Sequence, residues 1–254
     1  MTEDDIALAH RLADAAGAAI RPFFRAPFTM EAKADASPVT QADRAAEAAM
    51  RAILGAERPG DGIIGEEYGV EREEAERVWV LDPIDGTRSF VAGRPTFGTL
   101  IALMEAGRPV LGVIDQPIAG ERWIGSTGRP TTLNGIAART RACGAIGQAH
   151  LATTGPLHFT AGEKSRFDTL GAAARDILWG GDCYNYALLA SGHLDLVAEA
   201  GLKIYDLAAL VPVVEGAGGR MCDWRGAPLT SESDGRVLAA GDPALVEAAL
   251  ALLG

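Results

Sequence analysis

The chain is poor in the residues that build disulfide frameworks and zinc sites. Its 254 residues include only three cysteines and four histidines. No two cysteines stand in the CxxC spacing of a zinc knuckle or redox motif, and their odd number argues against a disulfide framework. At this length a chain buries roughly 70–75% of the surface of its unfolded form, so a hydrophobic core alone can hold the fold together.

Basic residues and long hydrophobic runs are also scarce. Twenty-three lysines and arginines against 34 aspartates and glutamates give a formal net charge of −11 at pH 7. Non-specific nucleic-acid binding needs lysine and arginine to neutralise phosphates, so this balance argues against a nucleic-acid partner. The apolar runs are far shorter than the ~20 residues that span a bilayer. Residues 1–5 are acidic where a signal peptide would be basic. We therefore expect a cytoplasmic protein with no membrane partner.

Common catalytic motifs are missing as well. The sequence has no P-loop pattern, no GxSxG nucleophile elbow and no HExxH pair. Residues 60–65 match GxGxxG, but they follow an expected helix instead of a strand, which is the wrong context for a dinucleotide site. The four histidines show no ligand spacing, and we assign none of them a catalytic role.

Hydrophobic periodicity predicts two N-terminal helices followed by an antiparallel meander. Residues 3–24 have apolar side chains at helical spacing after Thr2, a favourable N-cap, and a second helix is expected over 40–54. Turn sequences rich in glycine and proline separate the apolar segments that follow. Those segments predict strands at 78–81, 97–104, 110–115 and 121–124.

After residue 140 the pattern changes to shorter strands that alternate with helices. Strands are expected near 151–154, 177–179, 194–199, 220–223 and 237–239. Helices are expected over 163–174, 183–190, 206–217 and 243–253. We expect an α/β (α+β) fold with two sheets and layered helices. An N-terminal lobe, 1–140, and a C-terminal lobe, 141–254, would pack together as one unit.

Four groups of acidic residues stand at the ends of expected elements, where side chains can converge on one cleft. They are Asp43 near the start of the second helix, Glu66-Glu67 after an apolar pair, Asp82 and Asp85 after the strand 78–81, and Asp206 at a helix start. Each also has a structural interpretation: Asp206 as an N-cap, Thr40 and Asp43 as a capping box, and Glu66-Glu67 as solvated loop charges. Because all four groups would have to be structural at once, we favour a shared functional site over these structural interpretations.

The strongest argument comes from the hexapeptide Asp82-Pro83-Ile84-Asp85-Gly86-Thr87. A carboxylate directly after an apolar strand is positioned by the sheet, and the proline fixes a turn that brings the second carboxylate back toward the first. The Ile84 carbonyl offers another oxygen ligand, and Gly86-Thr87 offer backbone N–H groups to an anion. Hard oxygen ligands beside an anion seat suit Mg²⁺ held together with a substrate phosphate.

Three segments together resemble the signature motifs of the inositol monophosphatase family. They are Gly65-Glu66-Glu67, Asp82-Pro83-Ile84-Asp85-Gly86-Thr87 and Tyr205-Asp206-Leu207-Ala208-Ala209, in the family's order. The resemblance implies the layered αβαβα sandwich of the inositol monophosphatase and fructose-1,6-bisphosphatase type. It also implies a homodimer and Mg²⁺-dependent, lithium-sensitive phosphomonoesterase activity. Two or three Mg²⁺ ions would bind, and Mn²⁺ is a candidate substitute.

Motif matching also implies a role for each site residue. The metal ligands would be Glu66, Asp82, the Ile84 carbonyl, Asp85 and Asp206. Gly86 and Thr87 would seat the phosphate through their backbone amides. Asp43 would pair with Thr87, and this pair, with Glu66, would help activate water. Tyr205 stands where many family members have tryptophan, a difference that concerns packing more than catalysis.

Within the family, several longer stretches resemble the histidinol-phosphate phosphatase branch. They are residues 97–103, 109–112, 115–117, 120–123, 180–184 and 203–206. Histidinol phosphate carries a protonated amine and an imidazole, whereas inositol phosphate offers only hydroxyls. A site for it should hold acids beyond the metal ligands, and Asp182 and Glu199 are the candidates. Asp182 also fits an alternative role as the N-cap of the following helix.

We therefore expect hydrolysis of L-histidinol phosphate to L-histidinol and phosphate by metal-activated water, a step of histidine biosynthesis. Inositol-1-phosphate or a range of sugar and polyol phosphates are alternatives, and bisphosphates are disfavoured because the sequence shows no basic cluster suited to a second phosphate. A haloacid-dehalogenase-type phosphatase would need acids two residues apart, whereas Asp82 and Asp85 are three apart. From another class, a regulatory binding protein on the same fold stays open.

Overall fold

The computed structural model describes residues 1–26, 30–32 and 38–254. Helix α1 (Glu3–Ile20) begins as predicted at Thr2, whose hydroxyl accepts the Asp5 N–H while the Asp5 carboxylate accepts the Thr2 N–H. It ends in the 3₁₀ turn η1 (Arg21–Phe23), which contains Pro22. Helix α2 (Gln41–Glu57) runs beyond its predicted end. Strands β1 (Met30–Ala32) and β2 (Pro38–Thr40) pair antiparallel before it.

An eight-stranded sheet follows, with the order β10-β9-β8-β7-β6-β5-β3-β4. Its strands are β3 (Gly62–Gly65), β4 (Gly69–Glu71), β5 (Arg77–Asp85), β6 (Gly98–Glu105), β7 (Arg108–Gln116), β8 (Glu121–Ser126), β9 (Arg129–Leu133) and β10 (Ile136–Ala137). The meander predicted from the sequence is confirmed from β5 to β8, where each strand pairs antiparallel with the next. Strand β3 joins its edge parallel to β5.

A five-stranded sheet lies in the second half of the chain, with the order β12-β11-β13-β15-β14. Its strands are β11 (His150–Thr153), β12 (Asp176–Trp179), β13 (Leu196–Glu199), β14 (Arg220–Cys222) and β15 (Val237–Ala240). The associated helices are α4 (Ala161–Ala173), α5 (Tyr184–Ala190), α6 (Ile204–Leu207), α7 (Leu210–Gly216) and α8 (Val246–Leu253), with the 3₁₀ turns η2 (Ile146–Gln148), η3 (Pro156–His158) and η4 (Pro243–Leu245). The strands of the two sheets fall on either side of residue 140. The division into two lobes there stays a prediction.

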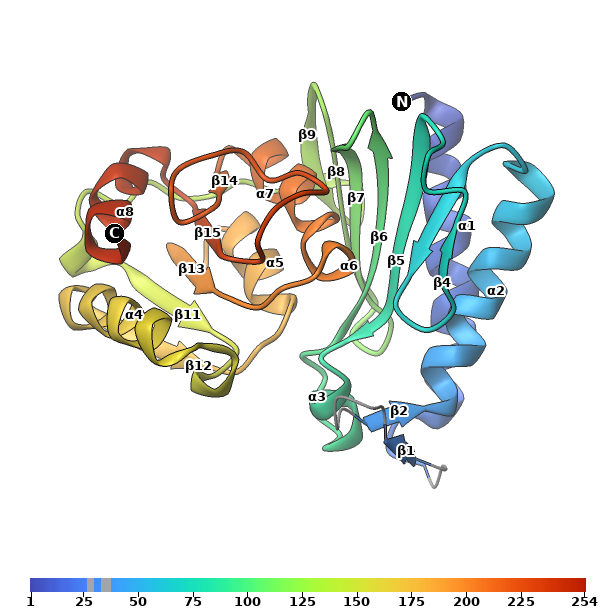
Figure 1. Ribbon diagram of the computed structural model, residues 1–254, viewed down its shortest axis with the longest axis horizontal. Coiled ribbons are helices and arrows are strands. Elements are labelled where there is room, and N and C mark those ends of the chain that lie inside the picture. Colours follow the sequence, from blue (N-terminus) through green and yellow to red (C-terminus); the bar gives the residue numbers. More distant parts are fainter. Residues whose placement is uncertain (27–29, 33–37) are drawn as a thin grey trace.

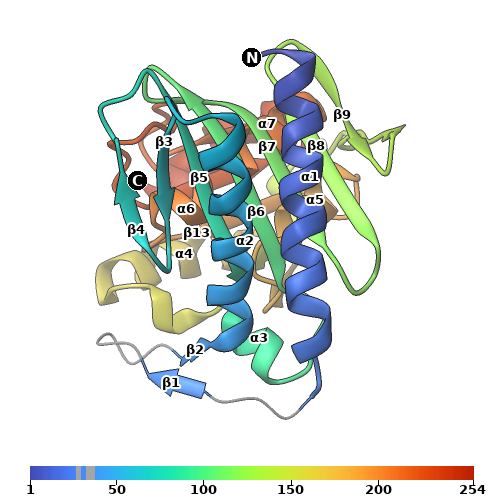
Figure 2. The same cartoon turned by 90° about the vertical axis from the view of Figure 1, so that its right-hand side faces the viewer.

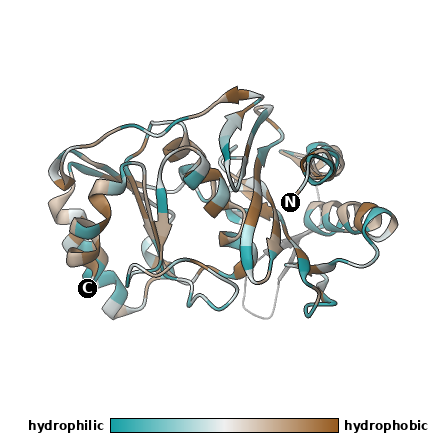
Figure 3. Cartoon of the chain, turned by 90° about the horizontal axis from the view of Figure 1, so that it is seen from above, coloured by the Kyte–Doolittle hydropathy of each residue, from teal (hydrophilic) through white to brown (hydrophobic). Residues whose placement is uncertain are grey.

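Helices and sheets alternate in five layers, which confirms the expected αβαβα sandwich (Figure 1). Helices α1 and α2 lie side by side on one face of the larger sheet (Figure 2), and α5, α6 and α7 lie between the sheets. Figure 3 looks down on these layers with α1 beginning at the N label. Helices α4 and α8 pack on the outer face of the smaller sheet. Among the described helices, none is long and apolar enough to cross a membrane.

Strand alternation explains why the layers hold together. In β5, Val78 and Val80 join the core between the two sheets, whereas Trp79 and Leu81 join the core beneath α1 and α2. Successive side chains of a strand point to opposite faces, so an entirely apolar strand is buried on both sides. Burying each such side chain contributes about 1.5–3 kcal/mol relative to leaving it exposed.

Two paired glycines set the distance between the larger sheet and the middle helices. Gly112 of β7 pairs with Gly125 of β8. A Cβ at Gly112 would lie 2.0 Å from the Ala209 carbonyl oxygen, and one at Gly125 would lie 2.1 Å from that of Pro212. The sequence predicts one helix over 206–217, which is wrong because α6 ends at Leu207 and α7 begins at Leu210. The backbone of Ala209 and Pro212, at the start of α7, packs directly against the sheet.

Candidate metal and phosphate site

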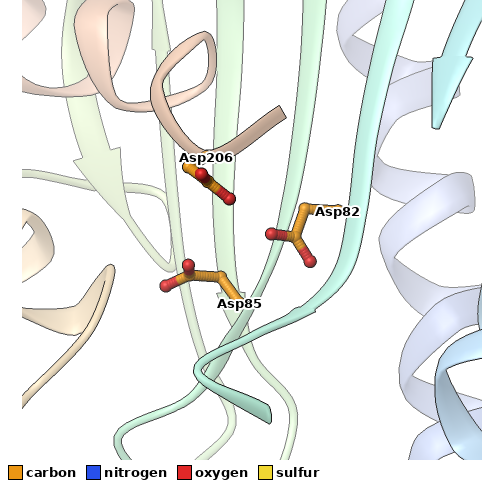
Figure 4. Close-up of side chains that lie close together, drawn as sticks. All are labelled: Asp82, Asp85 and Asp206. Atoms are coloured by element: carbon orange, nitrogen blue, oxygen red, sulfur yellow. The ribbon is translucent and has the colours of Figure 1, made fainter. Parts of the chain in front are cut away.

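Three aspartates from two elements meet in the pocket between the sheets. Asp82 and Asp85 lie at the end of β5, where the pairing with β6 shifts register between them. The Thr99 hydroxyl donates to the Pro83 carbonyl at 2.7 Å and holds this irregularity in place. Asp206 comes from α6, and Figure 4 shows its carboxylate directed toward the other two. One ligand oxygen from each lies within 4.8 Å of the others.

Burial and mutual repulsion make this cluster unfavourable without a cation. Asp82 is 1% exposed, and its Oδ1 has no hydrogen-bond partner among the described residues. Burial raises the pKa of Asp82 well above its usual value, and the charges of Glu66, Asp85 and Asp206 raise it further. Burial likewise raises the pKa of Asp206 to about 7, although the Lys203 N–H donates to its carboxylate at 2.6 Å. Buried carboxylates facing one another suit a divalent cation.

The two remaining predicted acids lie close to this cluster. Glu66 follows β3 and lines the same pocket, and its N–H donates to the Leu81 carbonyl at 3.2 Å. Asp43 is buried on α2, and its charge also raises the pKa of Asp82. The structure therefore brings all four acidic groups of the sequence together.

Two of the structural interpretations from the sequence are corrected here. Glu66 is half-buried and the Glu67 side chain is 2% exposed, so neither is a solvated loop charge. Asp206 is not an N-cap: it lies three residues after the Lys203 cap, and its carboxylate reaches back to the cap N–H. The Thr40 side chain, expected in a capping box with Asp43, lies outside the described residues.

The residues after Asp85 turn sharply into a short helix, α3 (Thr87–Val91). Gly86 precedes it at φ +85°, a left-handed conformation that favours glycine, and a Cβ there would lie 2.6 Å from Cγ of Asp182. The Thr87 hydroxyl donates to the Ile84 carbonyl at 3.1 Å, which leaves that oxygen a second lone pair. The pairing of Thr87 with Asp43 stays a prediction.

The same pocket carries the two acids proposed for the substrate, which we call the substrate wall, next to the three aspartates, which we call the metal wall. The pocket has a volume of about 460 Å³, and Asp182 and Glu199 both line it. Asp182, at φ +47°, accepts the Ser89 hydroxyl at 2.6 Å. Glu199 accepts the Thr154 N–H at 2.8 Å and the Tyr186 hydroxyl at 2.9 Å. Burial raises the pKa of both carboxyl groups.

The backbone next to Asp182 is hydrogen-bonded to the metal cluster. Cys183, the residue after Asp182, donates its N–H to Asp85 Oδ2 at 2.6 Å. Cys183 itself occupies the N-cap position of α5, so the alternative of Asp182 as that helix's N-cap is wrong. All three cysteines are buried and free.

Several pocket residues escape the sequence reasoning. Ser89, Arg88, Arg94 and His158 line the pocket, the first two directly after the hexapeptide. Burial lowers the pKa of His158, and the charge of Arg88 lowers it further. The fold thus brings basic side chains from distant parts of the chain to the pocket, and the expectation that they do not form a site for a second phosphate stays a prediction. His158 lies 71 residues from Thr87 with no local signal.

Comparison with known proteins agrees with this arrangement. The inositol monophosphatase family model matches residues 1–253. The bifunctional phosphatase IMPL2 of Arabidopsis thaliana, named as chloroplastic, is 49% identical over 96% of this chain and 73% of its own length. The histidinol-phosphatase of Mycobacterium tuberculosis is 38% identical over 87% of this chain and 88% of its own. A solved inositol monophosphatase structure from Zymomonas mobilis is 60% identical, with a TM-score of 0.92 over 99% of this chain and 98% of that one.

The fold, the acidic pocket and these relatives together define a phosphatase. The chain belongs to the inositol monophosphatase family. Members of this family act on small phosphorylated substrates and generally depend on Mg²⁺, and the aspartate cluster offers the oxygen ligands that such an ion prefers.

Proposed function

We propose that this protein hydrolyses L-histidinol phosphate to L-histidinol and inorganic phosphate, a step of histidine biosynthesis. The observation that carries the proposal is a further pair of acids in the same pocket, the half-buried Asp182 and the buried Glu199, beyond the aspartate cluster. A protonated amine would bring an opposite charge to such acids, so donor and acceptor would both be ionised, whereas an inositol ring offers only neutral hydroxyl donors. Relatives named as histidinol-phosphatases support this substrate.

The donor set of the pocket fits Mg²⁺. The residues that would hold it are Glu66, Asp82, the Ile84 carbonyl, Asp85 and Asp206. When bound, Mg²⁺ would polarise the phosphoryl group and lower the pKa of a bound water. The orphaned Asp82 Oδ1 and the repulsion between the aspartates support a cation here, with Mn²⁺ as a substitute and Li⁺ as an inhibitor.

The protein's own groups would bind the phosphate and activate water. The amides of Gly86 and Thr87 would hold the phosphate, and Glu66 with the Thr87–Asp43 pair would orient the attacking water and take its proton. The water oxygen bonds to phosphorus as the bond from phosphorus to the histidinol oxygen breaks, and a proton passes to that leaving oxygen. No covalent enzyme intermediate forms, so a phospho-aspartate should not be trapped during turnover.

The second candidate substrate is inositol-1-phosphate. The 60% identity to a protein named as an inositol monophosphatase favours it, and the name of the Arabidopsis relative describes that enzyme as bifunctional. The pocket volume of about 460 Å³ accommodates either small molecule, so size does not separate them. Charge separates the two substrates, because only histidinol phosphate carries positive charge away from its phosphate.

Phosphate release in parallel assays tests the proposal. L-Histidinol phosphate and inositol-1-phosphate are each incubated with the protein in Mg²⁺ and in EDTA. We expect Mg²⁺-dependent release with the higher kcat/KM for histidinol phosphate. The reverse ratio would assign the enzyme to inositol phosphate, and no release from either substrate would favour a regulatory binding role on the same fold.

We also propose a cytoplasmic homodimer. The three free cysteines, typical of a reducing compartment, support the location, and the resemblance to a family of dimers supports the assembly. Light scattering on the purified protein should give twice the chain mass of 26.4 kDa. A single-chain mass would contradict the dimer and leave the catalytic proposal unaffected.

A further inference from the structure

One fully buried carboxylate lies outside every motif of the sequence analysis. Glu47 is 0% exposed and lies on α2, four residues and about one helical turn after Asp43. A carboxylate removed from water needs hydrogen-bond donors or a paired charge to remain in the fold. Glu47 has both, because Arg51 Nε donates to its Oε1 at 2.7 Å.

The other donors to Glu47 come from the loop that carries Glu66. The Glu67 N–H donates to Oε2 at 2.8 Å, and the Tyr68 N–H donates to Oε1 at 3.1 Å. On the other side, the Glu66 N–H donates to the Leu81 carbonyl of β5 at 3.2 Å. The backbone around Glu66 is therefore held from both directions, by the sheet before it and by Glu47 after it.

Gly65 is the residue that permits this arrangement. A Cβ at Gly65 would lie 1.9 Å from Oε1 of Glu47, inside any permitted contact. The φ of Gly65 is not in the left-handed region, so glycine is required here because of limited space and not because of an unusual backbone conformation. The carboxylate occupies the volume that any larger residue at position 65 would fill.

Arg51 extends the same network to the next turn. It donates to Glu71 Oε1 at 2.8 Å and also to the Gly69 carbonyl. The guanidinium thus compensates the buried charge of Glu47 and fixes the turn between β3 and β4. Glu47 itself is not among the residues that line the pocket, so we expect it to act through the Glu66 loop.

We infer that Glu47 is a positioning residue, which holds the Glu66 loop in place and thereby sets the affinity of the site for Mg²⁺. The inference rests on the metal-binding role of Glu66 in the proposed function. Helix α2 supplies two acids from one face: Asp43 lies beside the cluster and Glu47 holds the ligand loop. Groups that orient a metal ligand typically change metal affinity by about 10–100-fold when they are removed.

The test compares Glu47→Ala and Glu47→Gln with a matched control, Asp195→Asn. Asp195 is also buried, and it accepts Arg141 Nε at 2.7 Å and the His150 N–H at 2.8 Å, but it does not line the pocket. Calorimetric titration of the metal-free proteins with Mg²⁺ gives the dissociation constant, and differential scanning calorimetry gives Tm. The Mg²⁺ concentration for half-maximal phosphate release provides a second readout.

We expect the dissociation constant for Mg²⁺ to rise about 10–100-fold in Glu47→Ala. It should rise less in Glu47→Gln, because the amide oxygen can still accept one of the two loop N–H groups. Asp195→Asn should lower Tm comparably and leave Mg²⁺ affinity within about twofold of wild type. If Glu47→Ala does not fold, Glu47→Gln decides the question.

Three outcomes bear on this inference and on the proposed function. If the Glu47 variants have a lower Tm but bind Mg²⁺ as tightly as an active wild type, the positioning role is overturned and the proposed function is unaffected. A wild-type protein that binds no Mg²⁺ would overturn the proposed metal site and the inference with it. Wild-type Mg²⁺ binding without phosphatase activity, together with weaker binding by the Glu47 variants, would support the inference and contradict the function.

Discussion

The two walls of the pocket treat their acids differently. The cluster of Asp82, Asp85 and Asp206 faces inward, and one buried oxygen of Asp82 has no hydrogen-bond partner among the described residues. In the substrate wall, Glu199 has a donor on each oxygen and Asp182 has the Ser89 hydroxyl. In the metal wall, Asp85 and Asp206 each accept one backbone N–H, but the mutual repulsion of the carboxylates still calls for a cation from solution, whereas the acids of the substrate wall are oriented by the protein. This contrast suggests one wall for the metal and the other for the substrate.

Removing one charge from the metal wall should have the largest effect. Asp85→Asn deletes a carboxylate whose geometry is otherwise held by the Cys183 N–H. Losing a few kcal/mol of transition-state stabilisation should lower kcat about 1,000-fold for both substrates, since 1.36 kcal/mol is a factor of ten. Steady-state phosphate release checks this. Near-normal turnover in the folded variant would refute the assignment of Asp85 as a ligand.

A charge removed from the substrate wall should instead act on one substrate. Asp182→Asn keeps a residue that tolerates the backbone φ of +47° while it removes the negative charge. Loss of a hydrogen bond to a charged group, about 1.5–3 kcal/mol, should lower kcat/KM for histidinol phosphate roughly 10–150-fold. The value for inositol-1-phosphate should change little. An equal fall for both substrates would mean that Asp182 serves the common chemistry instead.

Stability without metal sharpens the same comparison. Asp82→Asn removes a buried charge that the nearby carboxylates repel, so the metal-free variant should be more stable than metal-free wild type. A gain of about 1 kcal/mol corresponds to roughly 2–4 °C in Tm for a chain of this size. With saturating Mg²⁺, wild type should instead be the more stable protein. Scanning calorimetry with and without Mg²⁺ measures both Tm values. A variant that is less stable than wild type in both states would contradict the proposed repulsion between the carboxylates.

The smallest effect should come from Ser89→Ala. Its hydroxyl orients Asp182 through one hydrogen bond of 2.6 Å. Because Ser89 acts on the substrate only through Asp182, we take the net value of an ordinary hydrogen bond, about 0.5–1.5 kcal/mol, and expect kcat/KM for histidinol phosphate to fall between about 2- and 13-fold. The double variant with Asp182→Asn should lose less than the product of the two single effects, because the residues share one interaction. Fully multiplicative losses would show that Ser89 acts independently of Asp182.

Features that depend on local sequence were predictable. An apolar strand followed by a proline and two acids located Asp82 and Asp85, and the meander followed from turn residues between apolar segments. The break between α6 and α7 was not predicted, and neither was the close packing of this backbone on Gly112 and Gly125, because that contact joins residues far apart in the sequence. The two-residue strand β10 carries too short a pattern to recognise.

Residues that matter through tertiary contact also escaped the sequence. Glu47 and Arg51 stand four apart on a helix and resemble an ordinary surface ion pair, yet both lie largely out of solvent beneath the Glu66 loop. His158 and Arg94 reach the pocket only because the chain folds back on itself. The motifs identified the chemistry, whereas the groups that orient it required the structure.

A crystal structure with Mn²⁺, L-histidinol and phosphate would test the division of the two walls most directly. Anomalous scattering would locate the metal independently of its ligands. The account predicts Mn²⁺ coordinated by Asp82, Asp85 and Asp206, with the histidinol ammonium within hydrogen-bond distance of Asp182 or Glu199. Metal absent from the three aspartates, or an ammonium directed away from both acids, would contradict it.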